Sequence, residues 1–187
     1  MHGVSGIVLA GGLGRRMGGV DKGLQLLHGK PMIEHVLARF APQVDEIVIN
    51  ANQNHDRYAA FGHRVVPDRV GGFAGPLAGL HAGLAAISRP LAVTVPCDSP
   101  FLPADLVERL QRELRSNDVA VAKTGDQPHP VFALVRRAVA ASLEGFLSSG
   151  GRKIDAWYAS LKTVEVSFDD EADAFRNINT LEELGRS

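Results

Sequence analysis

The chain has little of several features, and each shortage excludes a class of protein. A single cysteine among 187 residues rules out an intramolecular disulfide framework and a zinc site made of cysteines alone. Only 8 Phe, 2 Tyr and 1 Trp are present, and no basic patch interleaves with them, which argues against an RNA-binding surface. The 20 Lys and Arg nearly balance the 21 Asp and Glu. The formal net charge of -1 therefore gives no overall attraction to nucleic acid or to an anionic membrane.

Long apolar runs are also missing. The longest stretch without Lys, Arg, Asp or Glu is Val70–Ser88, and it contains five glycines, Pro76 and His81. A membrane-spanning helix needs about 20 predominantly apolar residues. The early apolar run Ile7–Ala10 is too short for the core of a signal peptide. We therefore expect a cytoplasmic protein that binds neither a membrane nor a nucleic acid.

Glycine, by contrast, is abundant. The chain has 20 glycines, well above the average usage of roughly 7%. Nine of them lie in residues 1–30 and six in residues 62–83. Glycine clustered beside apolar strands indicates loops in which the backbone approaches another group closely, whereas glycine in a flexible linker would be spread out.

Short apolar segments typical of buried strands alternate with segments of helical period. The predicted strands cover Ser5–Ala10, Glu46–Asn50, His63–Val66, Leu91–Val95, Val119–Ala122, Val131–Val135 and Thr163–Phe168. The predicted helices cover Met32–Phe40, Asp56–Phe61, Gly75–Ile87, Pro103–Leu114, Arg136–Leu147 and Ile154–Leu161, and a T-x-x-E capping box from Thr180 to Glu183 predicts a terminal helix. This alternation predicts one α/β domain over residues 1–187. It would be a three-layer sandwich around a mostly parallel, doubly wound, Rossmann-like sheet, with ligands bound outside the carboxyl ends of the strands.

The glycine-rich loop after the first strand is the first candidate site. Its backbone N–H groups, Arg16 and Lys22 suit a polyphosphate. The P-loop motif G-x-x-x-x-G-K-[ST] does not fit, because Asp21 precedes Lys22, and a dinucleotide motif starting at Gly12 meets Met17 where its last glycine belongs. We therefore expect a phosphate-binding loop of another kind. The alternative is an exposed strand-to-helix turn whose glycines serve only its geometry.

Asp98 is the second candidate, because it follows a buried strand at the edge where ligands bind. Mg²⁺ on a nucleotide commonly uses one or two carboxylates together with phosphate oxygens and water. The residue could equally form a turn or cap a helix. Its neighbour Cys97 is best explained as a small buried residue, since no base lies near it in the sequence.

Two further segments carry polar or glycine-rich patterns. Asp68 precedes the second glycine cluster, Gly71–Gly79, where a flat base or a ribose could lie against the backbone. A tight contact between a helix and the sheet would require the same small residues. Asn177 and Asn179 could hydrogen-bond a polar ligand, although Asn179 also suits a turn before the Thr180 cap.

These segments together resemble one family. The sequence L-A-G-G-x-G-R-R-M-G-G-x-D-K-G, which starts at Leu9, is similar to the signature of the molybdenum cofactor guanylyltransferases, the MobA family. Related cytidylyl enzymes have a shorter L-A-A-G-x-S-x-R-M-G pattern, so Gly11 and the extension to Lys22 favour the guanylyl branch. The resemblance continues in order along nearly the whole chain, through Gly29–Pro31, Ile49–Asn52, Phe73–Gly79, Pro96–Pro100, His129–Leu134 and Asn177–Thr180.

The resemblance implies a fold of the nucleotide-diphospho-sugar transferase type. It also implies that GMP passes from GTP to the phosphate of molybdopterin, or of its molybdenum-loaded form, with release of pyrophosphate. Asp98 would hold Mg²⁺, Arg16 and Lys22 would complete the catalytic set with it, and Asn177 and Asn179 would contact the pterin. The implied GTP site consists of Leu9, Ala10, Gly11, Gly12, Gly14, Lys22, Asn50, Asp68 and Asp98.

Two other functions remain open at this point. One is the same chemistry with another substrate, a cytidylyltransferase or a sugar-phosphate nucleotidylyltransferase. The other is a non-catalytic carrier of GTP or cofactor, against which the combination of Arg16, Lys22 and Asp98 argues, because a carrier needs no metal-binding carboxylate beside the phosphates. An enzyme or a carrier of this cofactor could also make transient contact with cofactor-delivery proteins or with acceptor molybdoenzymes.

Overall fold

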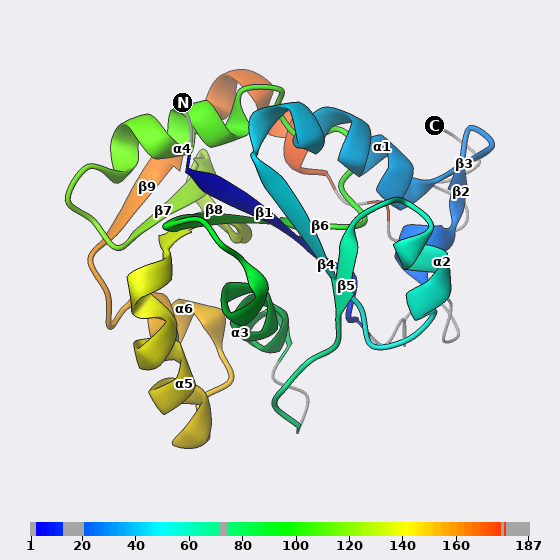
Figure 1. Ribbon diagram of the computed structural model, residues 1–187. Helices are drawn as coiled ribbons and strands as arrows, with labels where there is room; N and C mark the ends of the chain where they lie inside the picture. The colour runs from blue at the N-terminus through cyan, green and yellow to red at the C-terminus, as the bar shows by residue number, and fades with distance from the viewer. Residues whose placement is uncertain (1–2, 13–20, 72–74, 177, 179–187) are drawn as a thin grey trace.

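The computed structural model describes residues 3–12, 21–71, 75–176 and 178 (Figure 1). At its centre is a seven-stranded sheet with the order β5-β4-β1-β6-β8-β7-β9. Strand β8 pairs antiparallel with both of its neighbours, and the remaining strands all run in one direction. The predicted α/β fold with a mostly parallel sheet is therefore confirmed.

The elements have the following bounds. The strands of the sheet are β1 (Val4–Leu9), β4 (Glu46–Asn50), β5 (Arg64–Val66), β6 (Leu91–Pro96), β7 (Val119–Thr124), β8 (Gln127–Arg136) and β9 (Thr163–Ser167), and a separate hairpin consists of β2 (Leu26–Leu27) and β3 (Lys30–Pro31). The α-helices are α1 (Met32–Phe40), α2 (His55–Ala59), α3 (Pro76–Ala86), α4 (Leu106–Leu114), α5 (Ala140–Ser148) and α6 (Ile154–Tyr158). The 3₁₀ helices are η2 (Lys22–Leu24), η3 (Ala41–Gln43), η4 (Arg137–Val139) and η5 (Asp169–Phe175).

Helices cover both faces of the sheet, which gives three layers. Helices α1 and α4 with η5 lie on one face, and α3, α5 and α6 lie on the other (Figure 1). Ile7 and Val8 are adjacent in β1 and both fully buried, yet they belong to different hydrophobic clusters, because successive side chains of a strand point to opposite faces. Burial on both faces explains why β1 is apolar almost throughout. None of the described helices has both the length and the apolar character that crossing a bilayer requires.

The strands place the predicted site residues at one edge. In β1, Leu9 is in register with Asn50 of β4 on one side and with Pro96 of β6 on the other. The chain therefore brings the loop after β1, the end of β4 and the turn after β6 to the carboxyl edge. The order β4-β1-β6 shows that the sheet grows outward in both directions from β1, which is the switch point where such folds bind ligands.

The second half of the chain departs most from the sequence prediction. The helix predicted from Arg136 begins only at Ala140, because β8 continues to Arg136 and η4 follows it. Arg136 is held in the sheet by contacts distant in sequence, since its Nε donates to the carbonyl of Asn117 at 2.8 Å. Strand β8 also begins at Gln127, four residues before the predicted start. In the first half of the chain, the β2-β3 hairpin was not predicted. The Thr180 capping box lies outside the described residues.

Candidate active site

Lys22 and Asp98 meet at the carboxyl edge of the sheet. Lys22 begins η2, Asp98 lies in the turn after β6, and the distance from Lys22 Nζ to Asp98 Oδ2 is 3.2 Å. Their side chains are 23% and 12% exposed. A carboxylate buried to this degree requires a partner of opposite charge. Two of the three predicted catalytic residues are therefore in direct contact, while Arg16 lies outside the described residues.

The alternatives for Asp98 can now be decided in part. It does lie in a turn, but it does not cap a helix, since α4 begins at Leu106 with Asp105 at its N-cap position. The adjacent thiol of Cys97 is buried, and its burial together with the nearby carboxylate of Asp98 raises its pKa far above the ordinary value. Cys97 is thus a small buried residue as predicted, and the hard oxygen donor at this place is Asp98.

The structure also allows a test of whether Mg²⁺ suits the site. Among the residues that the structure describes, no cluster of three or more His, Cys, Asp and Glu forms a metal cage made of protein ligands alone. Nucleotide-bound Mg²⁺ needs no such cage, because phosphate oxygens and water complete its coordination. One buried aspartate beside a lysine at the glycine loop fits that requirement. The residues present therefore fit Mg²⁺ brought in with a nucleotide.

Asp68 lies in a second polar cluster at the same edge. Its Oδ1 accepts a hydrogen bond from Asn50 Nδ2 at 2.9 Å, and its Oδ2 accepts one from Asn52 Nδ2, also at 2.9 Å. Asn52 additionally accepts from the Asp68 backbone N–H at 2.8 Å and donates to the carbonyl of Gly11 at 3.0 Å. The predicted residues Asn50, Asp68 and Gly11 are therefore brought together. Asn52, which the sequence reasoning did not select, links them, and its place in the I-N-A-N segment was the available signal.

The two glycine clusters converge on the side chain of Asn50. A Cβ added to Gly11 would lie 2.8 Å from Asn50 Oδ1, and one added to Gly79 would overlap the same oxygen and lie 2.7 Å from Leu9 Cδ2. Real Cβ atoms essentially never approach other atoms within 3.0 Å. The interpretation of Gly79 as a tight contact between helix and sheet is thus confirmed. Gly12 differs, because no atom of the residues that the structure describes lies within 4 Å of its added Cβ.

The C-terminal segment passes beside Asp98. The backbone N–H of Ile178 donates to the carbonyl of Asp98 at 2.9 Å, and the Ile178 side chain is buried with Leu27 and Met32. Asn177 and Asn179, the predicted pterin residues, lie outside the described residues, as does Gly14 of the glycine loop. Their common neighbour Ile178 is nevertheless fixed next to the proposed metal ligand.

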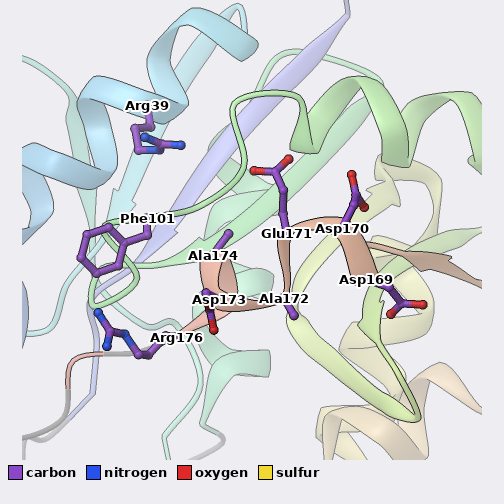
Figure 2. Close-up of a pocket in the computed structure, with 9 residues that line it drawn as sticks. All are labelled: Arg39, Phe101, Asp169, Asp170, Glu171, Ala172, Asp173, Ala174 and Arg176. Atoms are coloured by element: carbon purple, nitrogen blue, oxygen red, sulfur yellow. The ribbon is translucent and has the colours of Figure 1, made fainter.

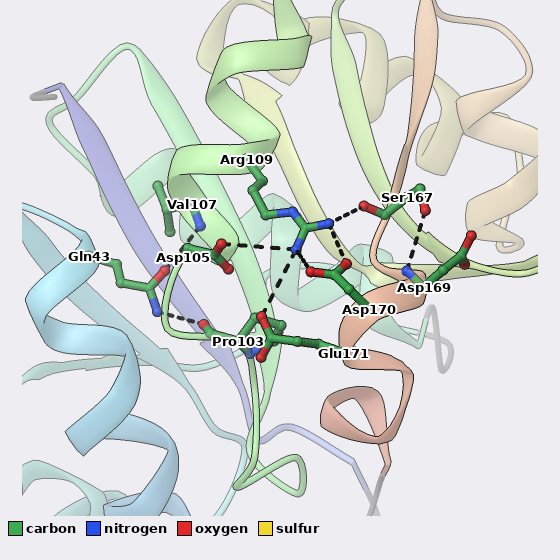
Figure 3. A network of polar contacts seen from close by, with 9 residues as sticks. All are labelled: Gln43, Pro103, Asp105, Val107, Arg109, Ser167, Asp169, Asp170 and Glu171. Carbon is green, nitrogen blue, oxygen red and sulfur yellow. Dashed lines mark hydrogen bonds and ion pairs between the residues drawn. The ribbon is translucent and has the colours of Figure 1, made fainter.

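Arg109 of α4 holds the element that leads into this segment (Figure 3). Its guanidinium lies 4.0 Å from the centroid of the Phe168 ring, donates to the carbonyl of Ser167 at 2.6 Å and pairs with Asp170 at 2.8 Å. This hydrogen-bonded pair raises the pKa of Arg109 and lowers the pKa of Asp170. The start of η5 is thereby fixed to α4, and the chain runs from there towards Ile178.

A hollow of about 590 Å³ lies beside η5 on the α1 side of the sheet (Figure 2). Arg39 and Phe101 form one side of it, acidic residues of η5 form the other, and the Arg176 guanidinium lies 5.3 Å from the centroid of the Phe101 ring. None of the predicted nucleotide residues that the structure describes lines this hollow. It is therefore separate from the Lys22 and Asp68 clusters.

Comparison with known proteins agrees with the motifs. The family description "MobA-like NTP transferase domain" matches residues 6–164. A molybdenum cofactor guanylyltransferase of Shewanella putrefaciens is 50% identical over 182 residues, which cover 96% of this chain and 93% of the relative. One of Burkholderia vietnamiensis is 53% identical over 192 residues, which cover 97% and 93%.

Solved structures extend the comparison to the fold. The crystal structure of molybdopterin-guanine dinucleotide biosynthesis protein A from Archaeoglobus fulgidus has a TM-score of 0.78 and 30% identity, and the match covers 97% of this chain and 95% of that one. A 4-diphosphocytidyl-2C-methyl-D-erythritol synthase from Anaerococcus prevotii shares only the fold, with a TM-score of 0.73 and 15% identity over 99% and 94% of the two chains. The protein is therefore a nucleotidyltransferase that belongs to the MobA-like NTP transferase family.

Proposed function

We propose that this protein is a molybdenum cofactor guanylyltransferase, which transfers GMP from GTP to the phosphate of molybdopterin and releases pyrophosphate. The names and the near-complete coverage of relatives about 50% identical to it support this proposal. The observation that carries it is the contact between Lys22 and Asp98 at the switch point, where the backbone N–H of Cys97 donates to the carbonyl of Leu9 at the end of β1. This contact would join a phosphate-binding cation to a metal-binding carboxylate.

The GTP would lie along the carboxyl edge from Gly12 to Asp68. The backbone N–H of Ala10 already donates to the carbonyl of Asn50 at 2.8 Å, so this part of the loop is fixed by the sheet. Gly12, whose Cβ position no described residue approaches within 4 Å, would let phosphate come close to the main chain. Asp68 and its two asparagine partners offer the acceptors and donors that guanosine requires.

The transfer needs positioning and charge stabilisation more than covalent chemistry from the protein. An oxygen of the acceptor phosphate, already ionised at pH 7, attacks the α-phosphorus of GTP in line. A bond forms between that oxygen and the α-phosphorus, the bond from the α-phosphorus to the bridging oxygen breaks, and pyrophosphate leaves with the bonding electrons. No protein nucleophile and no strong general base are required.

Charge stabilisation would come from three side chains, those of Lys22, Arg16 and Asp98. Lys22 and Arg16 would neutralise the charge that accumulates on the pyrophosphate, and Asp98 would hold the metal. Mg²⁺ bound there supplies Lewis-acid polarisation of the α-phosphate. Without nucleotide, Lys22 and Asp98 satisfy each other's charge at 3.2 Å. On GTP binding, Lys22 would exchange the carboxylate for phosphate oxygens.

The acceptor would approach from the C-terminal segment. Asn177 and Asn179 flank Ile178, whose backbone N–H is hydrogen-bonded to the Asp98 carbonyl. A pterin held by these amides would have its phosphate near the carboxylate that holds the metal. This placement supports the assignment of the two asparagines to the acceptor half of the site.

One assay tests the proposal as a whole. Purified protein is incubated with GTP, Mg²⁺ and molybdopterin, and the product is identified by mass spectrometry. Molybdopterin guanine dinucleotide and pyrophosphate should form only when all components are present. GTP binding without turnover in this complete mixture would instead identify a non-catalytic carrier.

Nucleotide selectivity is tested separately by thermal shift with GTP, CTP, ATP and UTP. A ligand that binds only the folded state raises stability by mass action, so the nucleotide that binds most tightly gives the largest shift at equal concentration. We expect the largest shift with GTP. A larger shift with CTP would reject the guanylyl assignment in favour of a cytidylyltransferase.

A further inference from the structure

Tyr58 of α2 belongs to none of the family motifs, yet its side chain lies beside the residues that carry Lys22. Its side chain is fully buried, and its hydroxyl donates a hydrogen bond to Asp21 Oδ1. Asn54, at the N-cap position of the same helix, donates to Asp21 Oδ2 at 2.9 Å. Both carboxylate oxygens of Asp21 are thus bound by groups from α2, and Asp21 is the residue directly before Lys22.

Asp21 also organises the backbone that carries Lys22. Its carbonyl accepts from the backbone N–H of Leu24 at 3.2 Å and from Gln25 Nε2 at 3.3 Å. Asp21 therefore stands at the N-cap position of η2 and joins that short helix to α2. Hydrogen bonds to a charged group are about twice as strong as those between neutral groups, which makes this junction firm.

The Tyr58 hydroxyl also lies beside Gly23, the residue that follows Lys22. A Cβ added to Gly23 would lie 2.6 Å from Tyr58 Oη and 3.2 Å from both Cβ and Sγ of Cys97. The hydroxyl, the Gly23 backbone and the Cys97 side chain are therefore packed together. Gly23 follows Lys22 and Cys97 precedes Asp98, so this packing fixes the neighbours of both charged residues.

We propose that Tyr58 and Asp21 are positioning residues that hold the backbone of Lys22 beside Asp98 before the nucleotide binds. A lysine side chain is flexible, so the place of its ammonium group depends on the backbone that carries it. Fixing that backbone in advance removes an ordering cost from nucleotide binding and from the transition state. Burial first, and then the neighbouring Cys97 and the hydrogen bond to Asp21, raise the pKa of Tyr58 far above its ordinary value, so the hydroxyl stays a donor at any working pH.

The chain offers a matched control for this proposal. Tyr158 is also buried, at 5% exposure, and its hydroxyl donates to the carbonyl of Pro130 at 2.9 Å on the α6 side of the sheet. The variants Tyr58→Phe and Tyr158→Phe each remove one buried hydroxyl and one hydrogen bond. Both should lose a similar amount of stability, and only Tyr58→Phe should affect Lys22.

The first readout does not depend on the proposed function. Trace acetylation with acetic anhydride, followed by mass spectrometry, measures the reactivity of Lys22 relative to Lys30, whose side chain is 64% exposed. We expect Lys22 to react several-fold faster in Tyr58→Phe and in Asp21→Asn than in the wild type or Tyr158→Phe. Equal Lys22 reactivity in all four proteins would overturn the proposal.

A milder variant keeps the test decisive should Tyr58→Phe fold poorly. Asn54 is exposed and has a positive φ of 54°, which glycine adopts without strain. Asn54→Gly removes only the second hydrogen bond to Asp21. We expect a smaller rise in Lys22 reactivity in the same direction, and a Lys22 reactivity identical to the wild type would count against the role of Asp21.

The second readout rests on the proposed function and separates positioning from acceptor binding. In guanylyl transfer, Tyr58→Phe should lower kcat about tenfold or more and leave the KM for the acceptor unchanged. The kcat of the double variant Tyr58→Phe, Asp21→Asn should be no lower than that of the less active single variant. A wild-type protein without guanylyl transfer would refute the proposed function, while the Lys22 labelling still tests the positioning. An active wild type with equal kcat in Tyr58→Phe and Tyr158→Phe would refute the positioning alone.

Discussion

His129 of β8 stacks on Phe175 at the end of η5, with the ring centroids 4.6 Å apart and the planes inclined by 13°. The Nε2 atom of His129 is hydrogen-bonded to Thr124 Oγ1 at 2.7 Å, and Phe132 meets the imidazole edge-on. Phe175 is the last residue of η5 before the segment that reaches Ile178. The stack therefore connects the H-P-V-F segment, which matched the family without an assigned role, to the C-terminal segment that passes beside Asp98.

This stack predicts a loss of stability in mild acid. Burial lowers the pKa of His129, so the folded state binds fewer protons than the unfolded state, whose histidine has a pKa of about 6.5. The free energy of unfolding is then unaffected above that value and falls as the pH decreases below it. His129→Phe keeps an aromatic ring, and urea unfolding should show a smaller decrease in its stability between pH 7.5 and 5. Burial also lowers the pKa of His63, so this residue adds a second decrease of stability in the same pH range. His63→Gln, which removes only this second contribution, is therefore the reference variant. If the stability of His129→Phe depended on pH as strongly as that of the wild type, the prediction would be contradicted.

The contact between Lys22 and Asp98 predicts that the two residues act as a unit. Lys22→Ala and Asp98→Asn should each lower kcat about 100-fold or more, because the first would remove a cation that offsets the charge developing on pyrophosphate and the second would weaken the proposed hold on the metal. The double variant should lose little beyond the poorer single one, as is usual for groups that act together. Steady-state kinetics with saturating GTP measures these effects. Full activity of Asp98→Ala would contradict its assignment as the metal ligand.

Removal of the metal gives an independent test of Asp98. EDTA should abolish guanylyl transfer, and added Mg²⁺ should restore it, since in the proposed site the buried Asp98 would contribute one carboxylate and phosphate and water would supply the other metal ligands. Asp98→Asn should need a higher Mg²⁺ concentration for its residual activity. A Mg²⁺ titration of both proteins measures this shift. Coincident titration curves would place the metal on other residues.

Two helix glycines should respond in opposite ways to the same substitution. Gly79→Ala forces a Cβ into Asn50 Oδ1, and such overpacking costs about 1–3 kcal/mol. It should also weaken GTP binding, because Asn50 holds Asp68. Gly145 of α5 has no described residue within 4 Å of its added Cβ, so Gly145→Ala should stabilise the protein by about 0.5–1 kcal/mol. Urea unfolding and GTP titration measure both, and equal stability changes would be incompatible with the Asn50 contact.

How far the sequence predicted the structure depends on whether the signal was local. The strand from Ser5 was predicted because burial on both faces makes it apolar throughout, and the parallel sheet followed from the alternation of elements. The early start of β8 was not predicted because it depends on the pairing of Gln127 with Thr124 of β7. The late start of α5 was not predicted because Arg136 pairs with Leu91 of β6, and this pairing outweighs the local helical pattern. A two-residue turn at Gly125 joins β7 to β8, and this turn was not predicted from the sequence.

The same distinction between local and long-range signals applies to the candidate site. Lys22, Asp98, Asn50 and Asp68 were predicted from motifs, and the strand ends bring them to one edge. The partners that hold them were not predicted, since they act across space. Tyr58 lies 37 positions from Asp21, and no periodicity in the sequence reveals that its hydroxyl meets that carboxylate.

Gly12 and Gly125 separate nucleotide binding from folding. A Cβ added to Gly12 has no neighbour within 4 Å among the described residues, so Gly12→Val should keep the wild-type stability while it blocks the approach of phosphate and weakens GTP binding about tenfold or more. Gly125 has a φ of +53°, which costs a residue with a Cβ about 1–2 kcal/mol. Gly125→Ala should therefore lose stability and keep its GTP affinity. Calorimetric titration with GTP and urea unfolding of both variants test this crossed pattern. If Gly12→Val bound GTP as tightly as the wild type, the loop after β1 would not be the phosphate site, and its glycines would serve the geometry of the turn alone.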